Sequence, residues 1–280
     1  MLTPNICKME VEAPRIAKAA LPGQFLIVRP NEKGERIPLT ISDYNIEKGT
    51  VTIVTQLIGA SSAAIIATQE GEFFNDVVGP LGNPSAFVGM SDEELKGKKY
   101  IFIAGGVGTA PVYPQAKWLH EKGVAVDVII GAKTKDLLIY KEELGSVCDN
   151  LYLCTDDGSE GFKGLVTALL EKLVTEDGKE YSQAVSIGPM IMMKFVSETT
   201  RPFGVKTIVS MNTIMVDGTG MCGGCRLTVG GETKFACVDG PDFDGHQVDF
   251  DEAMRRAAIY KPQEQAARDH QCNLMKMEVK

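Results

Sequence analysis

The chain lacks any hydrophobic run close to the roughly 20 residues that a bilayer crossing needs. Its N-terminus also lacks the charged stretch followed by an apolar core that is typical of a secretory signal. No low-complexity segment and no internal repeat is found. From these absences we expect an ordinary globular protein with no membrane association and a cytoplasmic location.

Basic residues are also in the minority, since the formal net charge is −8. Binding to nucleic acid needs a concentrated basic face, and none is found, so we expect no nucleic-acid partner. Seven cysteines are an odd number. Cys7, Cys148, Cys154 and Cys272 are scattered, and the other three are crowded together, which favours a metal site in a reducing compartment over a disulfide framework.

The length of 280 residues, with 44% hydrophobic residues, suits two modest cores and an appendage. The first ninety or so residues resemble short strands separated by turns. Gln24–Val28 and Thr50–Gln56 are rich in aromatic or β-branched residues, and the turn cluster Gly79–Pro84 closes the region. We expect a small β barrel here.

Two segments of this region could hold a pyrophosphate. Arg36 lies close to Thr40, and Gly59 is followed by Ser61 and Ser62 at the start of an expected helix. An arginine fork and the N–H groups of a helix start both bind phosphate. On these residues alone, a solvated arginine and an ordinary helix cap explain the pattern better.

After a polar connector, in which Ser91 and Glu94 have the spacing of a capping box, strands and helices alternate. This alternation predicts a parallel sheet with helices on both faces. The expected strands are 100–104, 124–130, 150–154 and 184–187, with helices around 142–144 and at 164–174. Lys206–Met211 is expected to be a connecting apolar run.

Glycine-containing turns at 105–108, 158–164 and 188–189 follow expected strands, where ligands of parallel sheets bind. The first turn, Gly-Gly-x-Gly-x-Ala-Pro, is not the G-x-G-x-x-G fingerprint, so a standard Rossmann dehydrogenase is disfavoured. Asp156 and Asp157 end the third strand. A carboxylate there would bind a ribose diol and repel a 2′-phosphate, which favours NADH, although two acidic turn residues are an equally good explanation.

The segment Asp217–Cys225 contains a carboxylate and two thiols in a glycine-rich run, and Cys237 follows. The spacing from Asp217 to Cys222 and on to Cys225 is that of a plant-type two-iron cluster whose first cysteine is replaced by aspartate. An expected hairpin at 228–233 returns the chain to Cys237.

Zinc and free thiols are the alternatives for these cysteines. His246 is the only nearby imidazole, and the aspartates 239, 242 and 244 compete with Asp217 as the fourth ligand. Farther on, Phe250–Ile259 is expected to be an amphipathic helix that Pro262 interrupts or restarts. Cys272, Met275 and Met277 form an apolar end that would pack on the body or on a partner.

The order of these motifs resembles the ferredoxin–NADP reductase superfamily, and within it the electron-transfer subunits of dihydroorotate dehydrogenase and their relatives. The resemblance covers nearly the whole chain. It implies an FAD-binding β-barrel domain (1–95), an NAD(P)H-binding α/β domain (96–209), a two-iron iron–sulfur module (210–248) and a C-terminal helical tail (249–280). It also implies an NAD(P)H-dependent flavin oxidoreductase subunit.

The resemblance assigns residues to each cofactor. The FAD residues would be Arg36, Pro38, Leu39, Thr40, Gly59, Ser61 and Ser62. The NAD(H) residues would be Gly105, Gly106, Gly108, Thr109, Ala110, Pro111, Gly188 and Pro189. Asp156 and Asp157 join this set because of their position at the end of the third strand, not because of the resemblance. The [2Fe-2S] ligands would be Asp217, Cys222, Cys225 and Cys237. No catalytic residue is assigned.

Two departures from the family pattern matter. Ile187 precedes the Gly-Pro pair where many members of the family carry cysteine, which argues against a thiol role near the nicotinamide. Asp217 stands where the dihydroorotate branch has a fourth cysteine. Asp217, Cys-Gly-Gly-Cys-Arg and Phe235–Pro241 look instead like the small subunits of NADH-dependent reduced ferredoxin:NADP oxidoreductases, also called sulfide dehydrogenase subunits.

The implied function is electron transfer between NADH, FAD and the cluster, and onward to a larger flavin and iron–sulfur subunit that handles ferredoxin and NADP in an electron-bifurcating complex. The implied assembly is a hetero-oligomer. The alternative within the family is an electron-transfer subunit of dihydroorotate dehydrogenase. The alternative outside redox chemistry is a binding module stabilised by zinc.

Overall fold

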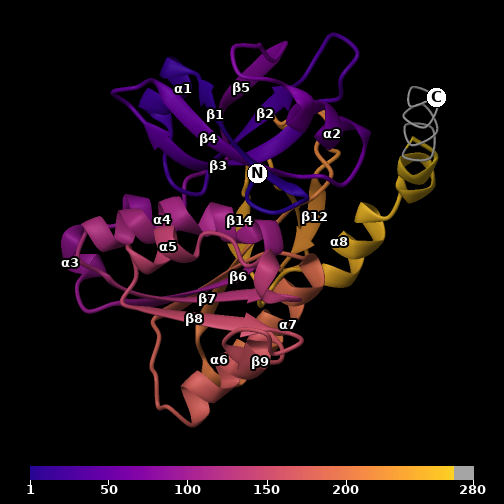
Figure 1. Cartoon of the computed structure of the whole chain (residues 1–280). Coiled ribbons are helices and arrows are strands. Elements are labelled where there is room, and N and C mark those ends of the chain that lie inside the picture. Colours follow the sequence, from indigo (N-terminus) through magenta and orange to yellow (C-terminus); the bar gives the residue numbers. More distant parts are fainter. Residues whose placement is uncertain (268–280) are drawn as a thin grey trace.

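A computed structural model describes residues 1–267 of the chain. An antiparallel sheet forms one layer, a parallel sheet with its helices forms a second, and the cysteine-containing segment lies alongside both (Figure 1). The residues 272, 275 and 277 of the expected apolar end lie outside the described part. Within residues 1–267, no helix is both long and apolar enough to cross a membrane.

The first layer is a five-stranded antiparallel sheet in the order β1-β4-β3-β2-β5. Its strands are β1 (Ile6–Glu12), β2 (Phe25–Arg29), β3 (Ile37–Asn45), β4 (Thr50–Gln56) and β5 (Asp76–Leu81). Bulges in the β3–β4 and β2–β5 pairs curve the sheet. Helices α1 (Pro14–Ala19) and α2 (Ala60–Ala67) complete its core. This layer is the expected barrel-type domain.

Strand β2 has two buried faces. Leu26 and Val28 belong to the core of the first layer, whereas Phe25 and Ile27 pack in a cluster that contains Cys225. Alternating side chains point to opposite faces of a strand, so every residue of this short apolar run is used. One strand therefore separates the barrel core from the cysteine segment.

The second layer is a seven-stranded sheet in the order β14-β11-β10-β6-β7-β8-β9. Its strands are β6 (Lys99–Gly105), β7 (Ala125–Ala132), β8 (Asn150–Thr155), β9 (Phe162–Lys163), β10 (Gln183–Ile187), β11 (Lys206–Ser210) and β14 (Asp242–Asp244). All neighbours are parallel except β11 and β14. The predicted parallel sheet is confirmed.

Helices cover both faces of this sheet. They are α3 (Asp92–Leu95), α4 (Thr109–Glu121), α5 (Lys141–Gly145), α6 (Val166–Thr175) and α7 (Met190–Thr200), with 3₁₀ turns at Ala86–Gly89, Gly106–Gly108, Lys135–Leu137 and Arg201–Phe203. Within β6, Tyr100 and Phe102 face the core with α4, and Ile101 and Ile103 face the core with α6. The continuous apolar run thus reflects a strand buried on both sides.

Two expectations about the strands were wrong. Residues 206–211 are not a connection, because Lys206–Ser210 is a parallel strand of the second sheet. Gly79–Pro84 is not only a turn, since β5 runs through Gly79 and Pro80. Proline is tolerated there because β5 is an outer strand of its sheet, where one row of N–H groups is not needed for pairing. The Arg36–Thr40 segment is mostly strand, because β3 begins at Ile37.

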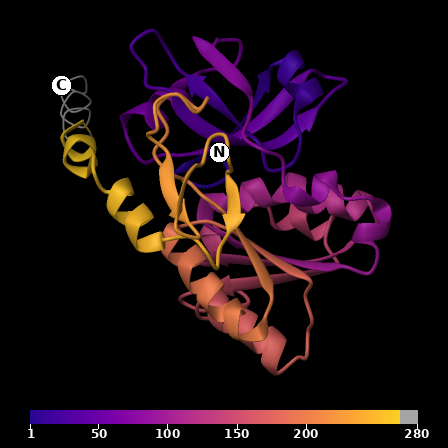
Figure 2. The ribbon, with the colours of Figure 1, turned by 180° about the vertical axis from the view of Figure 1, so that it is seen from behind.

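The cysteine segment forms the expected hairpin, with β12 (Arg226–Val229) paired to β13 (Glu232–Phe235). The helix α8 (Phe250–Ala257) follows and ends two residues before the expected limit. Seen from behind, the orange hairpin lies at the side where the two layers meet, and α8 leads away from the body (Figure 2). β14, from this segment, extends the second sheet. The domain limits given above remain predictions.

Candidate functional site

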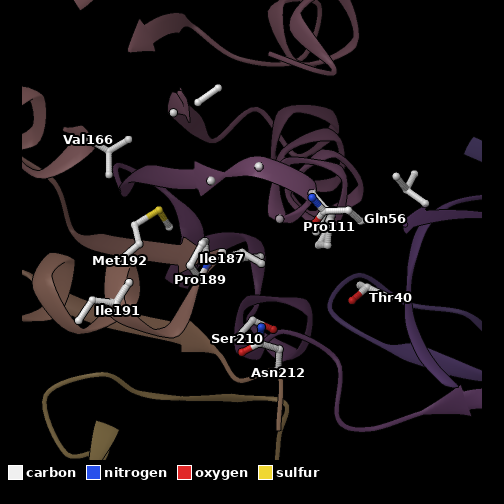
Figure 3. A pocket seen from close by; sticks show the side chains of 18 of the residues that line it. Thr40, Gln56, Pro111, Val166, Ile187, Pro189, Ile191, Met192, Ser210 and Asn212 are labelled. Atoms are coloured by element: carbon white, nitrogen blue, oxygen red, sulfur yellow. The ribbon is translucent and has the colours of Figure 1, made fainter. Parts of the chain in front are cut away.

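A cavity of about 970 Å³ opens between the two layers. Thr40 and Gln56 come from the barrel side, and Pro111, Ile187 and Pro189 come from the second layer (Figure 3). The second-layer residues follow the carboxyl ends of parallel strands, where open α/β sheets bind ligands. The cavity is large enough for two ring systems placed face to face.

Two glycine turns of the second layer touch each other at this cavity. A Cβ on Gly108 would lie 2.4 Å from the carbonyl oxygen of Ile187 and 2.8 Å from Gly188 Cα, so only glycine allows this approach. Gly106 has φ +57° and faces open space. The turn leads into α4, whose first N–H groups are suited to a phosphate. This cradle fits a dinucleotide.

The two acidic residues after β8 have different surroundings. Asp157 Oδ1 accepts hydrogen bonds from the Ser159 N–H at 2.9 Å and the Ser159 hydroxyl at 2.6 Å. These bonds, the hydroxyl first, lower the pKa of Asp157. Asp156 lines the cavity together with Lys133. Asp157 therefore shapes the loop, and Asp156 is available to a ligand.

On the barrel side, the expected phosphate turn is a capped helix start. The Ser62 hydroxyl accepts hydrogen bonds from the Ile58 and Gly59 N–H groups and donates to the Gly59 carbonyl. The Ser61 hydroxyl donates to Glu35. These bonds form the N-terminal cap of α2 beside the cavity wall at Ile58.

Arg36 carries an unsatisfied donor. Its Nε is shielded from solvent and has no hydrogen-bond partner among residues 1–267, while its Nη2 donates to the Asp217 carbonyl at 3.3 Å. A buried N–H without a partner costs about 1–3 kcal/mol, and a phosphate oxygen would satisfy it. The guanidinium thus fits an anionic ligand, and it also ties the barrel to the cysteine loop.

The predicted dinucleotide and flavin residues fall into two sets. Those lining the cavity are Pro38, Leu39, Thr40, Gly105, Gly106, Gly108, Pro111, Asp156, Gly188 and Pro189. Those outside its lining are Arg36, Gly59, Ser61, Ser62, Thr109, Ala110 and Asp157. Thr109 and Ala110 are fully buried beneath the turn, so their side chains support it.

The sequence did not point to several residues that line the cavity. Ser210 ends β11, Asn212 follows two residues later, and Met192 lies in the first turn of α7 (Figure 3). Recognising 206–210 as a strand would have placed Ser210 at the sheet edge. Phe25 lines the same cavity and also packs in the cluster that contains Cys225 and Cys237.

Two of the cysteines are paired in the hairpin core. Cys225 Sγ and Cys237 Sγ are 3.3 Å apart, and both residues are buried. Two thiolates on one tetrahedral metal, with bonds of about 2.3 Å, would be about 3.8 Å apart. Burial, with the Cys225 thiol as the second cause, raises the pKa of Cys237. The separation of the two sulfur atoms is about 0.5 Å shorter than that distance, so a small shift would let both bind one metal atom.

Cys222 lies in the exposed loop that begins at Asp217. The Gly224 N–H donates to its Sγ at 3.4 Å and lowers its pKa, as do the N–H groups of Asp217 and Val216. N–H groups directed at a thiolate are suited to a cluster ligand. The Asp217 carboxylate accepts from the Thr219 hydroxyl and N–H and from the Met221 N–H, which lower its pKa.

The competing ligands have other partners. Asp239 accepts from the Phe235 N–H, Asp242 from the Ser85 hydroxyl, and Asp244 from the His246 N–H. The His246 ring is 3.0 Å from the Thr200 hydroxyl. None of these contacts involves the cysteine loop.

The four predicted cluster ligands are spread out and do not surround a single point. In residues 1–267, no three side chains of His, Cys, Asp or Glu lie close enough to surround one metal ion. Cys225 and Cys237 form one pair, and Cys222 lies beside Asp217. Two pairs of donors fit a two-iron cluster, whose four ligands are divided between its irons, better than a single zinc ion.

Comparisons with known proteins identify two domains in the chain. Residues 102–198 match the oxidoreductase NAD-binding domain, and residues 212–249 match the iron–sulfur cluster binding domain of dihydroorotate dehydrogenase B. A solved structure described as the NADH-dependent reduced ferredoxin–NADP oxidoreductase contains a chain that is 43% identical, with a TM-score of 0.87. The match covers 96% of this chain and 94% of that one.

The fold and the site define an electron-transfer oxidoreductase with a ferredoxin reductase-like fold. A homologue of the dihydroorotate dehydrogenase B electron-transfer subunit from Thermotoga maritima is 46% identical over 91% of this chain and 86% of its own length. An uncharacterised protein from the adh 3′ region of Clostridium beijerinckii is 61% identical over 94% of this chain and 89% of its own. The chain belongs to the family of dihydroorotate dehydrogenase B electron-transfer subunits and their homologues.

Proposed function

We propose that the chain is the subunit that passes electrons between NADH, FAD and a [2Fe-2S] cluster, and from the cluster to a larger flavin and iron–sulfur partner. The observation that carries the proposal is the placement of three features. The cavity joins the barrel strand at Thr40 to the glycine turns of the second sheet, and Phe25 lines it and packs beside Cys225 and Cys237. A path for electrons needs these sites to be adjacent.

Each part of the site has its own task. NADH supplies a hydride, FAD accepts two electrons and releases them singly, and the cluster carries one at a time. Arg36 and the start of α2 would hold the flavin phosphates, and Thr40 would lie near the ring. The turn from Gly105 to Pro111 would hold the dinucleotide, with Gly188 and Pro189 beside the nicotinamide.

The donor set of the cluster is part of the proposal: Asp217, Cys222, Cys225 and Cys237. The adjacency of Asp217 and Cys222 supports it, as do the other partners of the competing aspartates. The variant Asp217→Cys should keep a two-iron spectrum with an altered potential, whereas Asp217→Ala should load poorly. Full loading and an unchanged potential in both variants would identify another fourth ligand.

The likeness to the NADH-dependent oxidoreductase chain supports an NADH-dependent reduced ferredoxin:NADP oxidoreductase as the complex, with ferredoxin and NADP(H) handled by the partner. The access of Asp156 to the cavity supports NADH as the nucleotide. The family's name supports a second candidate, the electron-transfer subunit of a dihydroorotate dehydrogenase. A cytoplasmic location is also proposed, because no disulfide joins any of the six described cysteines.

Anaerobic purification followed by absorbance and EPR spectroscopy tests the proposal. We expect bound flavin and a reducible two-iron signal that appears on addition of NADH. Stoichiometric zinc without flavin bands or a cluster signal would instead establish a zinc-stabilised binding module. The large subunit that purifies with the chain, and its oxidation of dihydroorotate or reduced ferredoxin, distinguishes the two redox candidates.

A further inference from the structure

Helix α8 packs directly on the hairpin that carries two of the cysteines. Phe250 and Ala253 are buried in the same cluster as Cys225 and Cys237. The Asp249 side chain caps the helix by accepting from the Glu252 N–H at 2.8 Å. These contacts fix the helix relative to the cysteines.

Two further contacts anchor the first turn of α8. The Asp249 N–H donates to the Thr228 carbonyl at 2.9 Å, so the start of α8 is joined to β12. Lys194 in α7 forms an ion pair with Asp251 at 2.8 Å. Because the first turn is anchored, residues one turn later approach the hairpin in a defined orientation.

Arg256 lies in that later turn, and its guanidinium binds the backbone on both sides of Cys225. Its Nε donates to the Arg226 carbonyl at 3.1 Å, and its Nη2 donates to the Gly224 carbonyl at 3.2 Å. A planar fork that binds two carbonyls restrains the peptide units between them. The two side chains between those carbonyls are those of Cys225, which is buried, and Arg226, which is exposed.

We propose that Arg256 is a positioning residue for the iron–sulfur cluster. It holds Cys225 in the orientation for ligation, and its positive charge beside the thiolates favours the reduced, more negative state of the cluster. The inference rests on the proposed function, because it takes Cys225 as a ligand. Outer groups that orient metal ligands typically change metal affinity or activity by about 10- to 100-fold when they are removed.

The neighbouring Arg255 provides a matched control. It lies on the same turn of α8 but is exposed, and its recorded electrostatic interaction is with Asp251. Arg255→Gln removes the same charge from the same helix without freeing the carbonyls at 224 and 226. Arg256→Lys keeps the charge but loses the planar fork.

The experiment uses the full chain with its flavin and cluster loaded, and it has two readouts. One is the cluster midpoint potential from an EPR-monitored titration, and the other is the rate at which a chelator bleaches the two-iron absorbance. For Arg256→Gln we expect a lower potential than for Arg255→Gln and bleaching about tenfold faster. Arg256→Lys should bleach faster than wild type while its potential stays close to the wild-type value.

The outcomes are separable. Equal potentials and bleaching rates in Arg256→Gln and Arg255→Gln would overturn the inference, because charge alone would then explain any change. If Arg256→Gln takes up no cluster, Arg256→Lys decides, and wild-type bleaching in that variant is the contrary result. A wild-type chain that binds no two-iron cluster would overturn the proposed function itself.

Discussion

Gly106 offers a sharp test of the dinucleotide cradle, because a second glycine has a similar backbone conformation but lies outside the cavity. Gly106 has φ +57°, and a Cβ added there would meet no atom within 4 Å. Gly123, at the far end of α4, has φ +68° and equally open space, but it does not line the cavity. The two positions therefore differ chiefly in their access to a ligand.

Replacement by alanine should cost the two positions similar stability. A left-handed conformation costs an ordinary residue roughly 1–2 kcal/mol, and neither Cβ adds a clash. The midpoint temperature of thermal unfolding should therefore fall by about the same amount in Gly106→Ala and in Gly123→Ala.

NADH binding should separate the variants. At Gly106 the methyl group would occupy the space through which a phosphate approaches the backbone, so a charge-assisted hydrogen bond worth about 1.5–3 kcal/mol would be lost. That loss corresponds to a dissociation constant about 10- to 150-fold higher. The measurement is the NADH dependence of flavin reduction in stopped flow. Similar NADH affinities in the two variants would refute the phosphate-binding role of this turn.

Three further predictions concern acidic residues. Asp127 is fully buried and 3.1 Å from Lys99, so Asp127→Ala should reduce the free energy of unfolding by about 3–5 kcal/mol, measured by denaturant titration. In Asp156→Ala, the ratio of kcat/KM for NADPH to kcat/KM for NADH should rise by at least about tenfold. In Asp157→Ala, kcat/KM should fall alike for both nucleotides. Burial raises the pKa of Asp242 from 3.8 to about 6 in spite of hydrogen bonds from Ser210 and Ser85, so its ionisation lowers stability as the pH rises between these values. Unfolding curves should therefore show Asp242→Asn gaining roughly 2.4 kcal/mol relative to wild type from pH 4 to pH 7.

The sequence allowed the second layer to be predicted well because local signals there are strong. The run 100–104 is apolar throughout and is followed at once by glycines, and it is indeed β6 with its turn. The capping box of Ser91 and Glu94 is also present, with hydrogen bonds in both directions. In these places the residues that determine the structure are neighbours in the chain.

Other features depend on distant partners and gave no local signal. β14 has three residues, and it is a strand only because Asp242–Asp244 meets Ser210 to Ile208 in space. Arg36 could be predicted to bind an anion, but its bond to the Asp217 carbonyl joins residues 181 positions apart. The spacing of hydrophobic residues along the sequence does not reveal contacts between residues that are far apart in the chain.

The adjacency of cavity and cysteines has its origin in one strand. Side chains of β2 alternate between the barrel core at Leu26 and Val28 and the cysteine cluster at Phe25 and Ile27. Phe25 also lines the cavity, and its backbone pairs with Thr40. A shift of one residue in the register of β2 would exchange the two faces, and the cysteine pair would lose its contact with the cavity wall. The register of this strand therefore determines both the barrel core and the distance that an electron must cross.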